Sequence, residues 1–260
     1  MPLQPPAVLL ANNFDARIDP AHYWISEKLD GVRAVWDGAV LRFRSGATIA
    51  APAWFVAGLP AQPLDGELWM GRDSFERLSG AVRRSQPDDE EWRAMRYMIF
   101  ELPGVPGDFT TRVEAMRALV AAAGVPWLEA VEQFRVAGRA ALQARLDEVV
   151  RDGGEGLMLH RADAPWLFGR DDALLKLKPW FDAEARVVAH VGGRGKYEGM
   201  LGALVVETPD GRRFRLGTGL TDAQRRDPPP IGTTVTYRYR GHTSTGLPRF
   251  ASFMRVRSVP

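Results

Sequence analysis

The pattern of apolar and polar residues predicts short β-strands through much of the first two thirds of the chain. Residues 23–44 read as a β-meander in which Asp37-Gly38 makes a hairpin turn between strands at 32–36 and 40–44. Further strands are expected where apolar residues run together, at 64–70, 96–102, 156–160 and 173–177. Residues 1–22 contain prolines and asparagines and are expected to be irregular.

Helical spacing predicts helices between these strands, at 74–84, 88–95, 112–123 and 139–151. Thr110 or Thr111 can cap the third of these helices, and Gly124 is expected to end it. Gly153-Gly154 is expected to end the fourth helix. The mixture of strands and helices predicts an α+β fold with antiparallel sheets and flanking helices.

Residues 179–182 separate this region from a shorter one with a different pattern. Glycine, proline and aspartate turns there divide five β-type runs, at 185–191, 203–207, 212–216, 233–240 and 252–256. About five strands in so short a stretch favour a small β-barrel such as an OB-fold. We therefore expect two domains, covering residues 1–182 and 183–260.

Composition excludes several classes of protein. The 45% apolar and 25% charged residues are typical of a globular protein, and no apolar run approaches the length of a membrane span. With no cysteine, the chain has no disulfide, thiolate zinc site or cysteine nucleophile. Residues 1–6 lack the charged start and apolar core of a signal peptide, and no membrane partner is expected.

The net charge of +2 is unevenly distributed along the chain. Residues 1–182 carry 21 basic and 26 acidic side chains, whereas residues 183–260 carry 13 basic and 6 acidic ones. A basic second domain suggests a polyanionic partner. The alternative is an ordinary basic surface in contact with solvent.

Lysine is rare in this chain: only 4 of the 34 basic residues are lysines, namely Lys28, Lys176, Lys178 and Lys196. Arginine supplies most other surface cations, but it cannot act as an amine nucleophile because its pKa stays above about 12. The lysines are therefore candidates for chemistry.

Lys28 lies in the stretch Lys28-Leu29-Asp30-Gly31, which by itself is a weak signal and fits a lysine on a strand edge equally well. Later strands add carboxylates, an aromatic ring and two more lysines: Glu67, Phe100, Glu155, Lys176 and Lys178. Such a set suits nucleotide transfer, in which an amine attacks a phosphate while other cations balance charge and carboxylates hold a metal. Core packing explains Phe100 alone, and a solvated strand edge explains the two later lysines.

The order and spacing of these stretches resemble the covalent nucleotidyltransferase superfamily, and specifically the minimal ATP-dependent DNA ligases of bacteria, over nearly the whole chain. Lys28-Leu29-Asp30-Gly31-Val32-Arg33 matches the motif whose lysine becomes adenylated. Arg44-Ser45-Gly46 resembles the element whose arginine contacts the ribose and the nick phosphate. Asp65-Gly66-Glu67 and Glu155-Gly156 resemble the motifs whose glutamates meet the ribose or metal.

The resemblance continues to the end of the chain. Phe100 falls where the family stacks an aromatic ring on adenine, and Lys176 and Lys178 resemble the motif that contacts the α-phosphate. Gly169-Arg170 resembles the basic element ahead of that motif. Arg255 and Arg257 partly match the last motif, which helps ATP to react.

This resemblance implies an enzyme that seals 5′-phosphate/3′-hydroxyl nicks in duplex DNA with ATP, through a lysyl-AMP intermediate. The domains would be a nucleotidyltransferase (adenylation) domain over 1–182 and an OB-fold domain over 183–260. Catalysis is assigned by resemblance to Lys28, Asp30, Arg44, Lys176 and Lys178. Nucleotide binding is expected to involve the four basic residues of that set, Lys28, Arg44, Lys176 and Lys178. It is also expected to involve Ser26, Glu27, Arg33, Glu67, Phe100, Glu155, Arg255 and Arg257.

Asp30, Glu67 and Glu155 are the expected ligands of Mg²⁺, for which Mn²⁺ can substitute. The expected partner is nicked double-stranded DNA, bound by a monomer through Arg44, Arg170 and the loop containing Gly193, Arg194 and Lys196. That loop can cradle a phosphate or be a simple mobile turn. The resemblance suggests the periplasm, with the cytoplasm as the alternative.

Two other functions remain open at the level of sequence. An RNA ligase or a GTP-using capping enzyme shares the lysine motif and the class of fold. A non-enzymatic nucleic-acid-binding module would carry the lysine motif by accident, although six ordered motifs argue against this.

Overall fold

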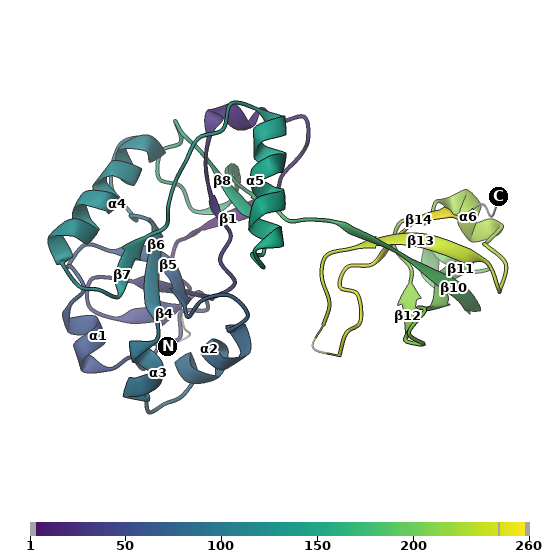
Figure 1. Cartoon of the computed structure of the whole chain (residues 1–260), viewed down its shortest axis with the longest axis horizontal. Coiled ribbons are helices and arrows are strands. Elements are labelled where there is room, and N and C mark those ends of the chain that lie inside the picture. Colours follow the sequence, from purple (N-terminus) through teal and green to yellow (C-terminus); the bar gives the residue numbers. More distant parts are fainter. Residues whose placement is uncertain (1–3, 244, 258–260) are drawn as a thin grey trace. The chain divides into compact units, whose positions relative to one another are not determined.

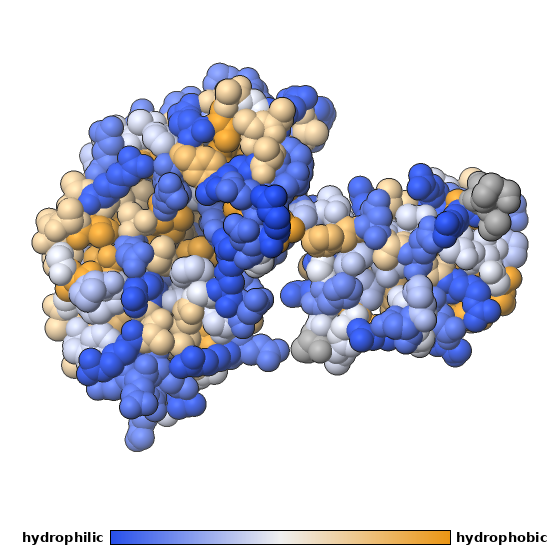
Figure 2. Space-filling view, in the orientation of Figure 1, coloured by the Kyte–Doolittle hydropathy of each residue, from blue (hydrophilic) through white to orange (hydrophobic). Residues whose placement is uncertain are grey.

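The computed structural model describes residues 4–243 and 245–257 and divides the chain into two compact units, Met1–Lys178 and Pro179–Pro260 (Figure 1). Residue 182, at the expected boundary, lies inside a strand of the second unit. None of the helices in the described part of the chain is long and apolar enough to cross a membrane. Hydrophilic residues cover much of the visible surface of both units (Figure 2).

The first unit contains a five-stranded sheet in the order β4-β3-β5-β6-β7, in which only the last pair is parallel. Its strands are β3 (Val32–Trp36), β4 (Leu41–Phe43), β5 (Leu64–Trp69), β6 (Arg96–Glu101) and β7 (Leu128–Ala130). The helices that share its core are α1 (Ala53–Ala57), α2 (Phe75–Val82), α3 (Asp89–Arg93) and α4 (Phe109–Ala123). Asp37-Gly38 lies between β3 and β4, which pair antiparallel as predicted.

The first unit also contains a four-stranded sheet in the order β1-β9-β8-β2. Its strands are β1 (Leu9–Asn13), β2 (Tyr23–Glu27), β8 (Leu157–Arg161) and β9 (Gly169–Leu177), with a short 3-10 turn, η1 (Pro20–His22), ahead of β2. Helix α5 (Arg139–Arg151) packs on this sheet through Leu142, Leu146 and Val149.

Two expectations for this region are wrong. Residues 23–44 do not form one meander, because β2 and β3 belong to different sheets and only the segment 28–31 joins them. Residues 1–22 are not wholly irregular, because β1 pairs in parallel with β9. Both errors concern pairing with strands far away in the sequence.

Helix ends follow local side-chain chemistry. Helix α4 ends at Gly124, which has a φ of 63°, as its lack of a side chain allows. Its cap is Asp108, which accepts a hydrogen bond from the Thr111 backbone at 2.8 Å, so the expectation of a threonine cap is wrong.

The second unit is one five-stranded antiparallel sheet in the order β12-β11-β10-β13-β14. Its elements are β10 (Phe181–Gly192), η2 (Gly195–Tyr197), β11 (Leu201–Glu207), β12 (Arg213–Leu216), α6 (Asp222–Arg226), β13 (Thr234–Tyr239) and β14 (Ser252–Val256). Past the end of β12, Thr218 forms a bridge with Ser252 of β14. The two edges of the sheet therefore meet at one point, in the manner of a small barrel.

Candidate active site

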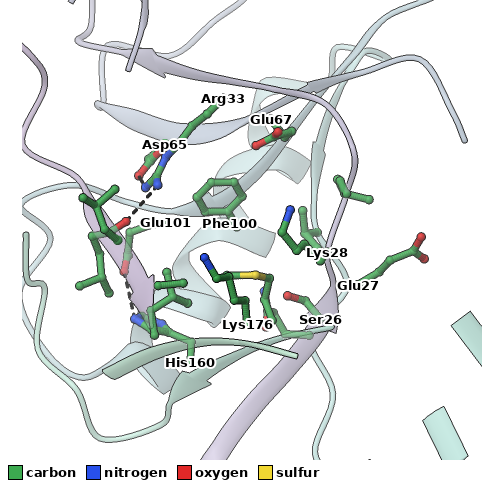
Figure 3. A pocket seen from close by; sticks show the side chains of 18 of the residues that line it. Ser26, Glu27, Lys28, Arg33, Asp65, Glu67, Phe100, Glu101, His160 and Lys176 are labelled. Atoms are coloured by element: carbon green, nitrogen blue, oxygen red, sulfur yellow. Dashed lines mark hydrogen bonds and ion pairs between the residues drawn. The ribbon is translucent and has the colours of Figure 1, made fainter. Parts of the chain in front are cut away.

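A cavity of about 290 Å³ lies in the first unit and is lined by residues from both of its sheets (Figure 3). The predicted site residues that line it are Ser26, Glu27, Lys28, Arg33, Arg44, Glu67, Phe100, Arg170 and Lys176. Asp30, Glu155 and Lys178 do not line it. The structure therefore brings most of the predicted residues of the first unit to one place.

Strand register explains how Lys28 meets its neighbours. Glu27 pairs with Leu157, and Leu157 pairs with Leu177, so the three strands β2, β8 and β9 end together. Lys28 lies just past one of these ends and Lys178 just past another. The backbone N–H of Lys28 donates to the carbonyl of Gly156 at 2.8 Å, which fixes the chain at this point.

Glu155 is shared between the two lysines. The Lys28 Nζ pairs with its Oε2 and the Lys178 Nζ with its Oε1. Burial alone would raise the pKa of Glu155, but the charges and hydrogen bonds of the two lysines outweigh it and hold the pKa below its ordinary value. We call these three residues the lysine cluster.

Arg33 of β3 fixes the wall of the cavity near Phe100. It donates to both carboxylate oxygens of Asp65, at 2.9 and 2.6 Å, and to the carbonyl of Leu9 at 2.9 Å. Its guanidinium carbon lies 5.3 Å from the centre of the Phe100 ring. Because these contacts join β3, β5 and β1, Arg33 ties the two sheets together beside the cavity.

Glu67 of β5 lies opposite Arg33 in the strand register and lines the cavity. Burial raises its pKa to about 7, although Lys28 and Arg33 counteract part of this effect. A half-buried carboxylate with such a pKa is partly protonated near neutral pH, and a bound cation would favour its ionised form.

Glu27 and Ser26 occupy different positions at the end of β2. Ser26 is buried and lines the cavity. The side chain of Glu27 turns away from the cavity (Figure 3) and pairs with Arg72 at 2.8 Å. The carboxylate of Glu27 is thus engaged by another protein side chain.

The sequence reasoning gave no role to Arg72 or to a buried group beside Phe100. In that group Arg112 donates to both carboxylate oxygens of Glu101, at 2.7 and 3.1 Å, and His160 lies 3.9 Å from the same carboxylate. Burial lowers the pKa of His160 to about 3, so the ring is neutral. The strand pattern around Glu101 and His160 could have singled out these two residues, but their contact depends on the fold and is not visible in the sequence.

The carboxylates fit a magnesium ion only in part. Among the described residues, no group of three or more histidine, aspartate or glutamate side chains is placed to hold a metal. Mg²⁺, however, usually takes one or two carboxylates together with substrate phosphates. Glu67 lines the cavity, whereas Glu155 lies outside the lining and its two carboxylate oxygens pair with Lys28 and Lys178. Asp30 is exposed and outside the cavity lining.

The remaining predicted residues belong to the second unit, so the cavity does not include them. Arg255 is exposed on β14, and Arg257 follows that strand and pairs with Glu184. Gly193 and Arg194 form the turn between β10 and η2, which contains Lys196.

Comparison with known proteins relates both units to one family. Residues 192–257 match the family described as DNA ligase OB-like domain. A DNA ligase of Haemophilus influenzae is 35% identical over 237 residues, which cover 91% of this chain and 87% of that protein.

Solved structures agree with this relationship. A structure from a structure–function study of Lig E DNA ligases is 45% identical and superposes with a TM-score of 0.80, covering 97% of this chain and 99% of that chain. The Chlorella virus DNA ligase-adenylate, at 23% identity and a TM-score of 0.57, covers 98% of this chain and 99% of its own, and shares the fold. Because these matches run through the cavity-bearing unit as well as the OB-like unit, the chain belongs to the DNA ligase family, among its minimal bacterial ATP-dependent members.

Proposed function

We propose that this ligase seals 5′-phosphate/3′-hydroxyl nicks in duplex DNA and that Lys28 carries the AMP of the intermediate. The observation that supports this is the lysine cluster, which places the amine of Lys28 at the wall of a cavity lined by Phe100. A lysine amine is a nucleophile only when neutral, and its position must be fixed for attack. Glu155 fixes it by accepting a hydrogen bond from its N–H.

In the first step the neutral Lys28 Nζ attacks the α-phosphorus of ATP, a P–N bond forms, the bond from that phosphorus to pyrophosphate breaks, and Glu155, the partner of Nζ, takes up the proton that the amine loses. We assign Phe100 to stacking on the base, because it lines the cavity and Arg33 bonds Asp65 on the adjacent strand β5. Positive charge for the phosphate in the transition state comes from two further lysines. Lys176 lines the cavity, and Lys178 forms an ion pair with Glu155.

A magnesium ion bound by Glu67 and Glu155 would neutralise phosphate charge in this cavity. The positive charge of Lys28 acts on both carboxylates. Glu67 also packs closely on the segment that follows Lys28, because a Cβ at Gly31 would lie 2.6 Å from Cγ of Glu67.

The later steps transfer AMP to the 5′-phosphate of the DNA and then release it when the 3′-hydroxyl attacks that phosphate. Arg44 and Arg170, which both line the cavity, are the residues we assign to the DNA phosphate. We assign Asp30 to the hydroxyl step, Arg255 and Arg257 to the first step, and Gly193, Arg194 and Lys196 to the DNA backbone. The working unit is a monomer on nicked duplex DNA.

Intact mass spectrometry tests the central assignment. After incubation with ATP and Mg²⁺, the protein should gain the mass of one AMP, and peptide mapping should place it on Lys28. Lys28→Ala should gain none. An adduct of unchanged yield in that variant would overturn the assignment.

The choice of nucleotide and nucleic acid needs a separate measurement. Adduct formation should be compared with ATP and GTP, and sealing should be compared on nicked DNA and nicked RNA. Labelling from GTP alone would favour a capping enzyme, and sealing of RNA alone would favour an RNA ligase.

A further inference from the structure

Arg72 joins three segments of the first unit that are distant in sequence. It lies in the connection between β5 and α2. Its guanidinium donates three hydrogen bonds to the carboxylate of Glu27, at 2.8, 3.0 and 3.2 Å. A fourth runs to the backbone carbonyl of Asp152, which caps α5, at 2.5 Å.

The two segments that Arg72 binds lead directly to the reactive pair. Glu27 immediately precedes Lys28 in the chain, and Asp152 is followed by Gly153-Gly154 and then Glu155. The segments also touch each other, because a Cβ at Gly154 would lie 2.8 Å from the Glu27 Oε1. The Arg72 guanidinium therefore restrains the two chain segments that lead to Lys28 and Glu155.

The loop that carries Arg72 is itself held in a defined shape. Gly71 and Asp73, on either side of Arg72, have φ values of 95° and 57°. A positive φ is uncommon for a residue with a side chain. The Ser74 hydroxyl donates to the carbonyl of Gly71 at 2.6 Å and closes the turn. Arg72 thus projects from a shaped turn.

We infer that Arg72 is a positioning residue for adenylation, which acts through Glu27 and the 152–154 segment to hold Lys28 and Glu155 in register. It does not line the cavity, so it has no contact with the nucleotide there. This inference rests on the proposed function of Lys28. It also changes the role of Glu27, which was expected to bind the nucleotide. Its carboxylate binds Arg72 instead.

The planar shape of the guanidinium explains why arginine is needed here. It can bond both oxygens of one carboxylate and still reach a carbonyl, whereas a lysine ammonium acts as a point charge. A misplacement of about 1 Å at a reacting group can cost about a hundredfold in rate. Arg72→Lys keeps the charge and should recover only part of the rate.

The test measures the rate constant of AMP adduct formation in a single turnover at saturating ATP, for the wild type, Arg72→Ala and Arg72→Lys. We expect Arg72→Ala to be slower by about 10- to 100-fold. Its apparent affinity for ATP should change by less than about threefold, because uniform binding is left intact. Its melting temperature should remain close to that of the wild type.

Arg96→Ala is the matched control. Arg96 also bonds a glutamate of a neighbouring strand, Glu129, at 3.1 Å and a backbone carbonyl, that of Met95, at 3.2 Å, and it does not line the cavity. Loss of a comparable surface contact should leave the rate of adenylation near that of the wild type.

Equal rates for Arg72→Ala and the wild type would overturn the inference. A slow rate would also overturn it if the variant had lost its affinity for ATP or had a much lower melting temperature. If Arg72→Ala does not fold, Glu27→Gln tests the same contact, and it should slow adenylation without weakening ATP binding. Combining the two changes should add little to either, because they break one interaction. A wild type that forms no adduct on Lys28 would contradict the proposed function instead.

Discussion

The lysine cluster and the buried arginine pairs of the first unit both join a cation to a carboxylate, but they differ in how much of the side chains is exposed. Lys28, Glu155 and Lys178 keep 25%, 23% and 26% of their side-chain surface exposed. Arg112 and Glu101 keep 0% and 6%. Arg33 and Asp65 belong with the buried pairs, because Asp65 keeps only 2%.

The difference separates groups that react from groups that hold the protein together. A partly hydrated lysine can leave a carboxylate for a phosphate at modest cost, since water compensates the exchange. A buried guanidinium with both oxygens of a carboxylate cannot leave without stranding a charge. For these pairs, exposure together with the choice of cation distinguishes the lysines that can exchange partners from the buried arginines that cannot.

The largest effect should come from turning the cluster into a pair of the arginine type. Lys28→Arg keeps the positive charge next to Glu155 but removes the nucleophile. We expect a folded protein that forms no AMP adduct, as judged by intact mass after incubation with ATP. Measurable adenylation of this variant on another residue would show that the cluster is not the reactive site.

A smaller effect, now on stability, should distinguish the two kinds of pair. Arg112→Ala leaves Glu101 buried without its partner and should lower the free energy of unfolding by about 3–5 kcal/mol. Lys178→Ala leaves Glu155 with Lys28 and should cost about 1 kcal/mol or less. Urea denaturation of the two variants measures both values, and similar losses would contradict the distinction drawn above.

Glu67 offers a pH test, since burial raises its pKa from 4.5 to about 7. Above about pH 4.5 the unfolded chain releases this proton while the folded protein retains it, so this contribution to stability falls as the pH rises towards 7. Glu67→Gln should remove the decline. Melting temperatures in metal-free buffer at pH 5 and pH 8 measure it, and parallel profiles for the two proteins would refute it.

The smallest effect is expected at the fourth lysine. Lys196 lies in the second unit, where its Nζ is 4.6 Å from the centre of the Tyr197 ring. Lys196→Arg keeps both the charge and the contact with the ring, so nick sealing should stay near the wild-type rate. A strong loss of sealing would mean that an amine matters outside the cluster as well.

Local patterns were enough to predict most elements. Helix α5 spans the predicted residues 139–151, and β14 spans the predicted 252–256, because periodicity and turn residues act over a few positions. The helices α1 and α6 and the strand β7 are too short to show a recognisable periodicity of apolar residues. The separation of β2 from β3 depends on pairing with β8 and lies outside any local signal.

Motif residues gather at the cavity only in part. Lys28, Glu67 and Phe100 line it, whereas Asp30, Glu155 and Lys178 belong to motifs and do not. The role of Glu27 was not predictable, because its partner Arg72 lies 45 residues away in sequence and belongs to no motif. The same holds for the pairing of Glu101 with Arg112, which reflects how α4 packs against β6.

Pro179 directly follows Lys178 and is the first residue of the second unit. Its ring fixes its own φ near −65° and confines the residue before it to extended backbone. Lys178 is therefore held in extended backbone just past the end of β9, where its Nζ pairs with Glu155. The proline thus limits the backbone freedom of one of the two lysines that share this carboxylate.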